Sequence, residues 1–163
     1  MVCETMPHTA PTYDHTQAGT AVVVILLAAA LVVFASLALT TRATGGIRAL
    51  PTVAVVIVGF TFVLLIAIAL VFSRLNVRVE GSELSWRFRF GVQEHRVAVA
   101  DIFHARVVSN PTHYGYGVRR LPNGWLYNVS GTKAVELVLR DGRTVRVGTD
   151  EPDVLLKAIG GAR

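Results

Sequence analysis

The sequence contains a single cysteine, Cys3, so no disulfide can form within the chain and a disulfide-stabilised scaffold is excluded. It also lacks the GxSxG, HExxH, P-loop and GxGxxG patterns that mark common enzyme and nucleotide-binding sites. His95, His104 and His113 lie in separate predicted strands or loops, without a cysteine or carboxylate at a spacing typical of a catalytic or metal site. We therefore expect a protein that is not an enzyme and that binds no cofactor or metal.

Charge is missing from two long stretches, residues 18–41 and 52–72, which contain no Asp, Glu, Lys, Arg or His. As α-helices they would be roughly 36 and 31 Å long, against about 30 Å for the hydrocarbon core of a bilayer. A signal peptide would have a basic segment before a much shorter apolar core, and the first stretch has neither feature. The sequence predicts an integral membrane protein with a transmembrane hairpin over residues 18–73. No ionisable group lies within either stretch, so we expect an anchor and not a pump or transporter.

The arginines around the hairpin indicate its orientation. No Lys or Arg precedes the first stretch, and only Arg42 and Arg48 lie between the two stretches. Four arginines follow the second stretch closely: Arg74, Arg78, Arg87 and Arg89. Because the more basic side of a membrane protein faces the cytoplasm, we expect a multi-pass protein of the cell membrane with both termini in the cytoplasm.

Two further segments flank the hairpin. Residues 1–17 have scattered polar side chains and no apolar periodicity, which predicts a disordered tail. Residues 74–163 carry 14 basic and 9 acidic side chains and are numerous enough for one small domain with a single core. Apolar and polar residues alternate there, as in half-buried strands. Seven strands are predicted, over residues 75–80, 83–90, 95–99, 102–108, 124–129, 134–140 and 144–149.

Three features define the predicted domain. Trp86, Phe88 and Phe90 fall on one face of the second strand, which we expect to line the core, whereas Arg87 and Arg89 fall on the other. The pair at residues 141–142, Asp-Gly, predicts a hairpin between the last two strands. A cap at residue 150 and an apolar stripe predict a C-terminal helix over about residues 151–159.

Two segments carry a family resemblance: FRFGVQEHRVAVADIFHARV (88–107) and VELVLRDGRTVRVGTDEPDVLLKAI (135–159). Together with the upstream hairpin, this pattern resembles the bacterial pleckstrin-homology-like (PH-like) membrane proteins, and the Ala-, Val- and Arg-rich composition is typical of actinobacteria. The resemblance implies an α+β membrane protein whose domain is a seven-stranded β-barrel or strongly bent sheet, with the C-terminal helix plugging one end. It implies no particular activity, because the fold hosts many roles.

The segment 109–124 is long for a connection in a compact domain, and such loops are usually functional or disordered. It interleaves aromatic and basic side chains suited to lipid headgroups or a protein partner: His113, Tyr114, Tyr116, Arg119 and Arg120. The alternative is a structured crossover whose tyrosines pack onto the barrel. A second candidate contact surface is the basic strand face of Arg87 and Arg89.

The sequence thus predicts a non-catalytic, membrane-anchored binding or scaffolding protein that presents its domain at the cytoplasmic face. Its expected partners are the membrane, anionic lipid headgroups and a protein. Nucleic acid is not expected, because basic residues alternate with acidic ones. The alternative function is a subunit or assembly factor of a larger membrane complex that uses the helices as its interface, for which Ala28–Ala30 would allow close packing. The sequence leaves homo-oligomerisation open.

Overall fold

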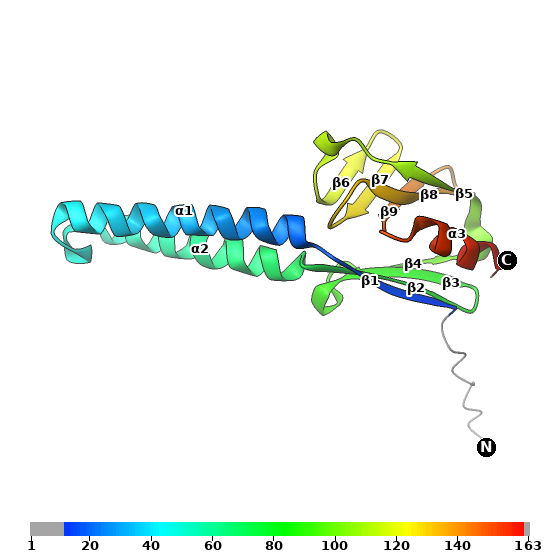
Figure 1. Cartoon of the computed structure of the whole chain (residues 1–163), viewed down its shortest axis with the longest axis horizontal. Helices are drawn as coiled ribbons and strands as arrows, with labels where there is room; N and C mark the ends of the chain where they lie inside the picture. The colour runs from blue at the N-terminus through cyan, green and yellow to red at the C-terminus, as the bar shows by residue number, and fades with distance from the viewer. Residues whose placement is uncertain (1–11, 162–163) are drawn as a thin grey trace, which may run out of the picture.

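A computed structural model describes residues 12–161, apart from the side chains of Ala49 and Thr112. Two long antiparallel helices project from a domain of two β-sheets, and a short third helix lies beside the sheets (Figure 1). The molecule is therefore an α+β protein, as predicted. The helices are α1 (Thr20–Thr44), α2 (Thr52–Val71) and α3 (Pro152–Gly161), and the short 3₁₀ turns are Ile47–Ala49, Arg89–Gly91, Val99–Asp101 and Thr112–Tyr114.

Helices α1 and α2 are long and apolar enough to cross a membrane, and only 6% of the most apolar segment of each is buried. Their bounds agree closely with the predicted stretches, although α1 continues through Arg42 before it ends. Gly45 and Gly46 have φ values of 84° and 129°, which glycine adopts without strain, and they reverse the chain between the helices. Inside the hairpin, Ala30 and Ala69 are almost fully buried, so small side chains allow the close approach of the helices.

The first sheet has the strand order β1-β2-β3-β4 and is antiparallel throughout. The second has the order β5-β8-β9-β7-β6, in which only the β7–β9 pair is parallel. The strands are β1 (Tyr13–Ala18), β2 (Arg74–Glu80), β3 (Glu83–Phe88), β4 (His95–Ala98), β5 (Ile102–Ser109), β6 (Gly117–Leu121), β7 (Gly124–Asn128), β8 (Lys133–Leu139) and β9 (Thr144–Gly148). All seven predicted strands form, and the hairpin predicted at residues 141–142 joins β8 to β9.

The two sheets correct the prediction of a seven-stranded barrel or one strongly bent sheet. The turn at Val99–Asp101 carries the chain out of the first sheet, and β5 then pairs with β8 and not with β4. Each sheet therefore keeps two edge strands, and no closed barrel forms from the described strands. The core lies between the sheets. It comprises alternate residues of β2 and β3, the facing residues of β7, β8 and β9, and Leu155, Ala158 and Ile159 of α3.

Strand β1 corrects the prediction of a disordered tail over residues 1–17. Tyr13 to Ala18 pair antiparallel with β2, in register from Tyr13 opposite Val79 to Ala18 opposite Arg74. The segment has little apolar alternation of its own, and its hydrogen bonds to β2 hold it in an extended conformation. His15 lies 2.6 Å from Asp150 through Nε2, which links β1 to the segment that begins α3. Residues 1–11 of the expected tail, including Cys3, lie outside the described residues.

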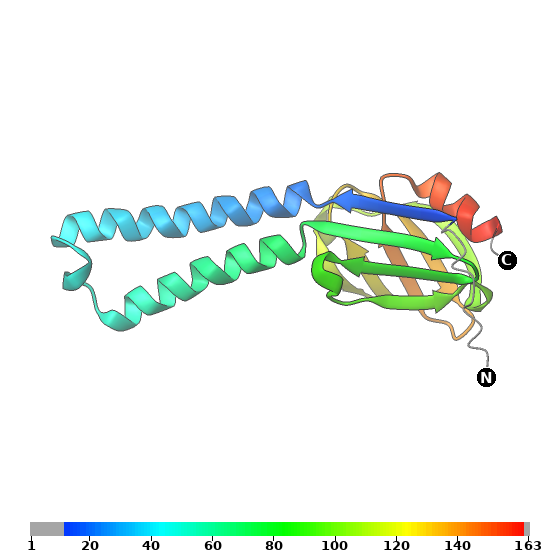
Figure 2. The ribbon, with the colours of Figure 1, turned by 90° about the horizontal axis from the view of Figure 1, so that it is seen from below.

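Both long helices run directly into paired strands (Figure 2): β1 leads into α1, and α2 leads into β2. The amide of Gly19 donates a hydrogen bond of 2.7 Å to the carbonyl oxygen of Ser73, which continues the β1–β2 ladder to the ends of the helices. An ideal Cβ at Gly19 would lie 2.3 Å from the carbonyl oxygen of Phe72 and 3.1 Å from Cβ of Val129. The junction therefore has no room for a side chain.

We expect Gly19→Ala to destabilise the protein by about 1–3 kcal/mol, because the methyl group must displace backbone atoms. Thermal unfolding of the full chain in detergent should show a midpoint lowered by roughly 4–8 °C. Gly59→Ala is the matched control: no atom lies within 4 Å of its ideal Cβ, and alanine favours a helix interior. Equal midpoints for the two variants would contradict a close-packed junction.

Candidate functional site

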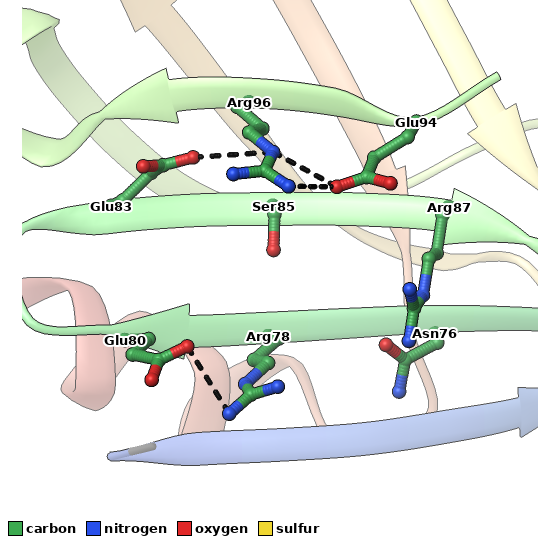
Figure 3. A pocket seen from close by; sticks show the side chains of 8 residues that line it. All are labelled: Asn76, Arg78, Glu80, Glu83, Ser85, Arg87, Glu94 and Arg96. Atoms are coloured by element: carbon green, nitrogen blue, oxygen red, sulfur yellow. Dashed lines mark hydrogen bonds and ion pairs between the residues drawn. The ribbon is translucent and has the colours of Figure 1, made fainter. Parts of the chain in front are cut away.

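The outer face of the first sheet carries a polar hollow of about 220 Å³ (Figure 3). Arg78 lies 3.1 Å from Glu80, and Arg96 lies 2.6 Å from Glu94 and 3.6 Å from Glu83. Pairs that are partly open to solvent, as these are, contribute little to binding or stability. Arg87 is different, because within the described residues its guanidinium forms no ion pair.

Arg87 lines this polar hollow and also a basic site at the end of the sheet nearest the hairpin, which we define as Arg74, Arg87 and Arg89. The three side chains come from the start of β2, from β3 and from the turn after β3, and they line a hollow of about 500 Å³. None of the described residues that line this hollow is acidic. Arg89 donates through Nη1 to Oγ of Ser73 at 3.3 Å, next to the end of α2. Three guanidinium groups without a carboxylate suit a phosphate or another anion.

Phe90 lies beside the basic site. The prediction that it lines the core is therefore wrong. Strand β3 ends at Phe88, and Phe90 has a φ of 63° and is 71% exposed. Such a φ is uncommon for a residue with a side chain and is usually maintained at functional positions. The Arg89 guanidinium lies 5.0 Å from the centre of the Phe90 ring. The turn therefore presents an aromatic ring and cations together. It lies next to the end of α2 (Figure 2).

The segment 109–124 is partly regular: Thr112–Tyr114 is a 3₁₀ turn and residues 117–121 form β6, which pairs with β7. The second half of the segment is therefore a regular strand, but neither tyrosine of the structured alternative lies in it. His113 is exposed and packs against Tyr114 edge to face, with 4.8 Å between the ring centres. Tyr116 and Arg119 line a cavity against α1 and α2, whereas Arg120 lines a separate cleft between the sheets. The structure thus divides the predicted contact residues of this segment among three places, all separate from Arg87 and Arg89.

The cleft between the sheets has a volume of about 410 Å³ and aromatic walls. The ring centres of Trp86 and His95 are 5.6 Å apart and stacked, and those of His95 and Tyr127 are 4.8 Å apart. Burial raises the pKa of Tyr127, so its hydroxyl stays neutral. The indole Nε1 of Trp86 is buried without a hydrogen-bond partner in the described part of the chain. Across residues 12–161 no group of three or more His, Cys, Asp or Glu side chains could hold a metal ion.

Comparisons with protein-family models, with curated proteins and with solved structures find no match. The PH-like and actinobacterial resemblance therefore stays a prediction. Sequence patterns missed Phe90 as an exposed residue and the hairpin side chains that line the cavity with Tyr116 and Arg119. Gly91, directly after Phe90, was the one local indication that the strand ends there.

A third charge cluster, on the outer face of the second sheet, has a structural role. Glu136 is 5% exposed and accepts hydrogen bonds of 2.7 Å from the Nε atoms of Arg106 and Arg146, which joins β8 to β5 and β9. Burial alone would raise the pKa of Glu136, but the hydrogen bonds and charges of the two arginines outweigh it and lower that pKa. The carboxylate form therefore stabilises the fold, and this stabilisation is lost as the pH falls through the lowered pKa.

We expect Glu136→Gln to lower the free energy of unfolding by about 1–3 kcal/mol near pH 7. Below about pH 4 the difference from the wild type should shrink, because Glu136 itself becomes protonated. Thermal unfolding in detergent at several pH values measures both effects. Asp141→Asn is the control, since Arg143 and Asp141 form an exposed pair whose loss should cost less. A pH-independent effect of Glu136→Gln would contradict the electrostatic role.

Proposed function

We propose that this chain is a non-catalytic, membrane-anchored binding or scaffolding protein. In this proposal α1 and α2 span the bilayer and hold a PH-like β domain at the cytoplasmic face, with the basic site against anionic lipid headgroups. The observation that carries the proposal is the direct continuation of both helices into the paired strands β1 and β2, at the end of the domain that bears the basic site.

The exposed apolar surface of the hairpin supports membrane insertion. Large side chains such as Leu31, Phe34 and Phe60 are more than half exposed. Helix α1 carries no charge before Arg42 in its last turn, and α2 carries none. A core helix of a soluble protein would be mostly covered, whereas lipid covers such a surface at no cost. The small buried residues Ala30 and Ala69 lie within the hairpin, and Ala28 is exposed. This arrangement favours an anchor over the alternative of a complex subunit with a small-residue interface.

The position of the basic site supports contact with headgroups. Ser73, the partner of Arg89, is two residues beyond the end of α2, and Arg74 is the next residue along the chain. If α2 spans the bilayer, these cations lie at the level of the headgroups, where each contributes about 1 kcal/mol of attraction to an anionic surface. The strand pairing leaves no flexible linker, so the domain keeps one orientation to the membrane. Anchoring raises its effective concentration there, so weak contacts with a partner suffice.

The basic site also favours binding over catalysis. Guanidinium groups stay protonated at all relevant pH values and cannot act as general bases. Among the described residues at the site, no nucleophile lies beside a base that would activate it. The site therefore suits the electrostatic recognition of an anion.

The proposal predicts that residue 90 contacts lipid. In a Cys3→Ser background, Phe90→Cys carries an environment-sensitive fluorophore, and the full chain is reconstituted in vesicles that contain phosphatidylglycerol. We expect a blue-shifted emission that is quenched by brominated lipid. Ser82→Cys is the matched control, because Ser82 is exposed at the opposite end of the same sheet. Equal, water-like emission at residues 90 and 82 would refute the proposed orientation.

A further inference from the structure

A cavity of about 560 Å³ lies between the base of the hairpin and the segment that leads into β6, and we call it the hairpin cavity. One wall consists of apolar side chains of α1 and of the end of α2: Val22, Ile25, Leu26, Ile68 and Phe72. The other wall consists of residues 115–119. Its volume is within the range of ligand pockets, about 300–1,000 Å³.

Two glycines in the second wall leave the space of the cavity free of side chains. Gly115 and Gly117 have φ values of 67° and 94°, so a side chain at either position would strain the backbone. The Arg119 guanidinium packs over the first of them, since Nη2 lies 3.5 Å from an ideal Cβ of Gly115. At Gly117 an ideal Cβ would lie 3.9 Å from the ring of Phe72. The backbone thus approaches the hairpin closely, with one cation at the edge of an apolar space.

Arg119 is exposed and forms no ion pair within residues 12–161. None of the described residues that line the cavity is acidic. The cavity therefore combines one uncompensated positive charge with an apolar wall. An anion with an attached hydrocarbon chain matches both.

We propose that the hairpin cavity binds one anionic phospholipid, with its phosphate at Arg119 beside Tyr116 and an acyl chain along Val22, Ile25 and Leu26. This inference rests on the proposed function, which places the start of α1 at the bilayer surface. Val22 and Leu26 are separated by about 6 Å along the helix axis, so the apolar wall extends from the headgroup level toward the hydrocarbon core. A lipid reaches this cavity from within its own leaflet, whereas a soluble ligand would have to enter the headgroup layer.

The neighbouring arginine provides a matched control. Arg119 and Arg120 are adjacent and both exposed, but Arg119 lines the hairpin cavity and Arg120 lines the cleft between the sheets. The full chain, purified in mild detergent with added phosphatidylglycerol or phosphatidylcholine, is measured by native mass spectrometry. We expect one retained phosphatidylglycerol on the wild type and on Arg120→Ala. For Arg119→Ala we expect about tenfold weaker binding, the effect of losing one charge-assisted contact.

A second pair of variants tests the apolar wall without changing charge. Leu26→Trp fills the cavity and should abolish retention, whereas Leu27→Trp, on an exposed position outside the lining, should not. Equal retention by the wild type, Arg119→Ala and Leu26→Trp would overturn the inference. Equal loss in Arg119→Ala and Arg120→Ala would also overturn it, because attraction would then depend on net charge alone.

The two proposals fail in different ways. A residue-90 fluorophore that contacts lipid, in a protein that retains no phosphatidylglycerol, would contradict the hairpin cavity and leave the proposed function standing. A water-exposed residue 90 would contradict the proposed function itself. Circular dichroism and thermal unfolding of every variant ensure that only folded proteins are compared.

Discussion

The antiparallel pairing of β1 with β2 is the contact on which the rest of the architecture depends. It joins the segment before α1 to the segment after α2, so the hairpin and the first sheet form one continuous unit. The same pairing places Tyr13, whose hydroxyl lies 3.4 Å from Oγ1 of Thr149, against the segment that begins α3. Without this pairing, the domain would be connected to the hairpin only through the end of α2. The orientation that we propose for the basic site relative to a membrane would then vary, and the proposed binding there would lose its geometric preorganisation.

Charge is arranged differently at the two ends of the first sheet. Away from the hairpin, arginines and glutamates neutralise one another along the outer face, as the pairs of Arg78 and Arg96 illustrate. Toward the hairpin, the hollow lined by Arg74 and Arg89 has no carboxylate among its described residues, and Arg87 lies at its border with the polar hollow. On the second sheet, Arg119 likewise lines a cavity beside the helices that has no acidic residue among its described lining. Unneutralised cations within one protein repel one another, and the anionic headgroups of the proposed function would offset this repulsion at the hairpin end.

Much of this fold was predictable from the sequence, because alternation and apolar run length report directly on strands and helices. The seven predicted strands, α1, α2 and α3 all follow from such local patterns. Strand β1 was not predictable, since its stability comes from hydrogen bonds to a partner that is distant in sequence. Phe90 continues the alternation of β3, yet the backbone reverses at Gly91 and exposes the ring. Arg119 and Arg120 are adjacent residues of the same type. They line different cavities because neighbouring residues of β6, which pairs with β7, point to opposite faces of the sheet.

The β domain and the hairpin differ in what they need from their surroundings. The core between the sheets is closed by its own strands and by α3, so the residues of this core are buried without another molecule. The hairpin leaves nearly all of its apolar surface uncovered, and only lipid or another apolar surface can satisfy it. Because the junction between them has no linker, the two requirements fix one orientation. In the proposed function a lipid would meet the hairpin cavity and the turn of Phe90. A partner from the aqueous side would meet the cleft, where the Trp86 indole lacks a hydrogen-bond partner among the described residues. In the proposed function the fold thus separates a membrane-facing surface from a solvent-facing one, and a bound partner would be held at a fixed position relative to the bilayer.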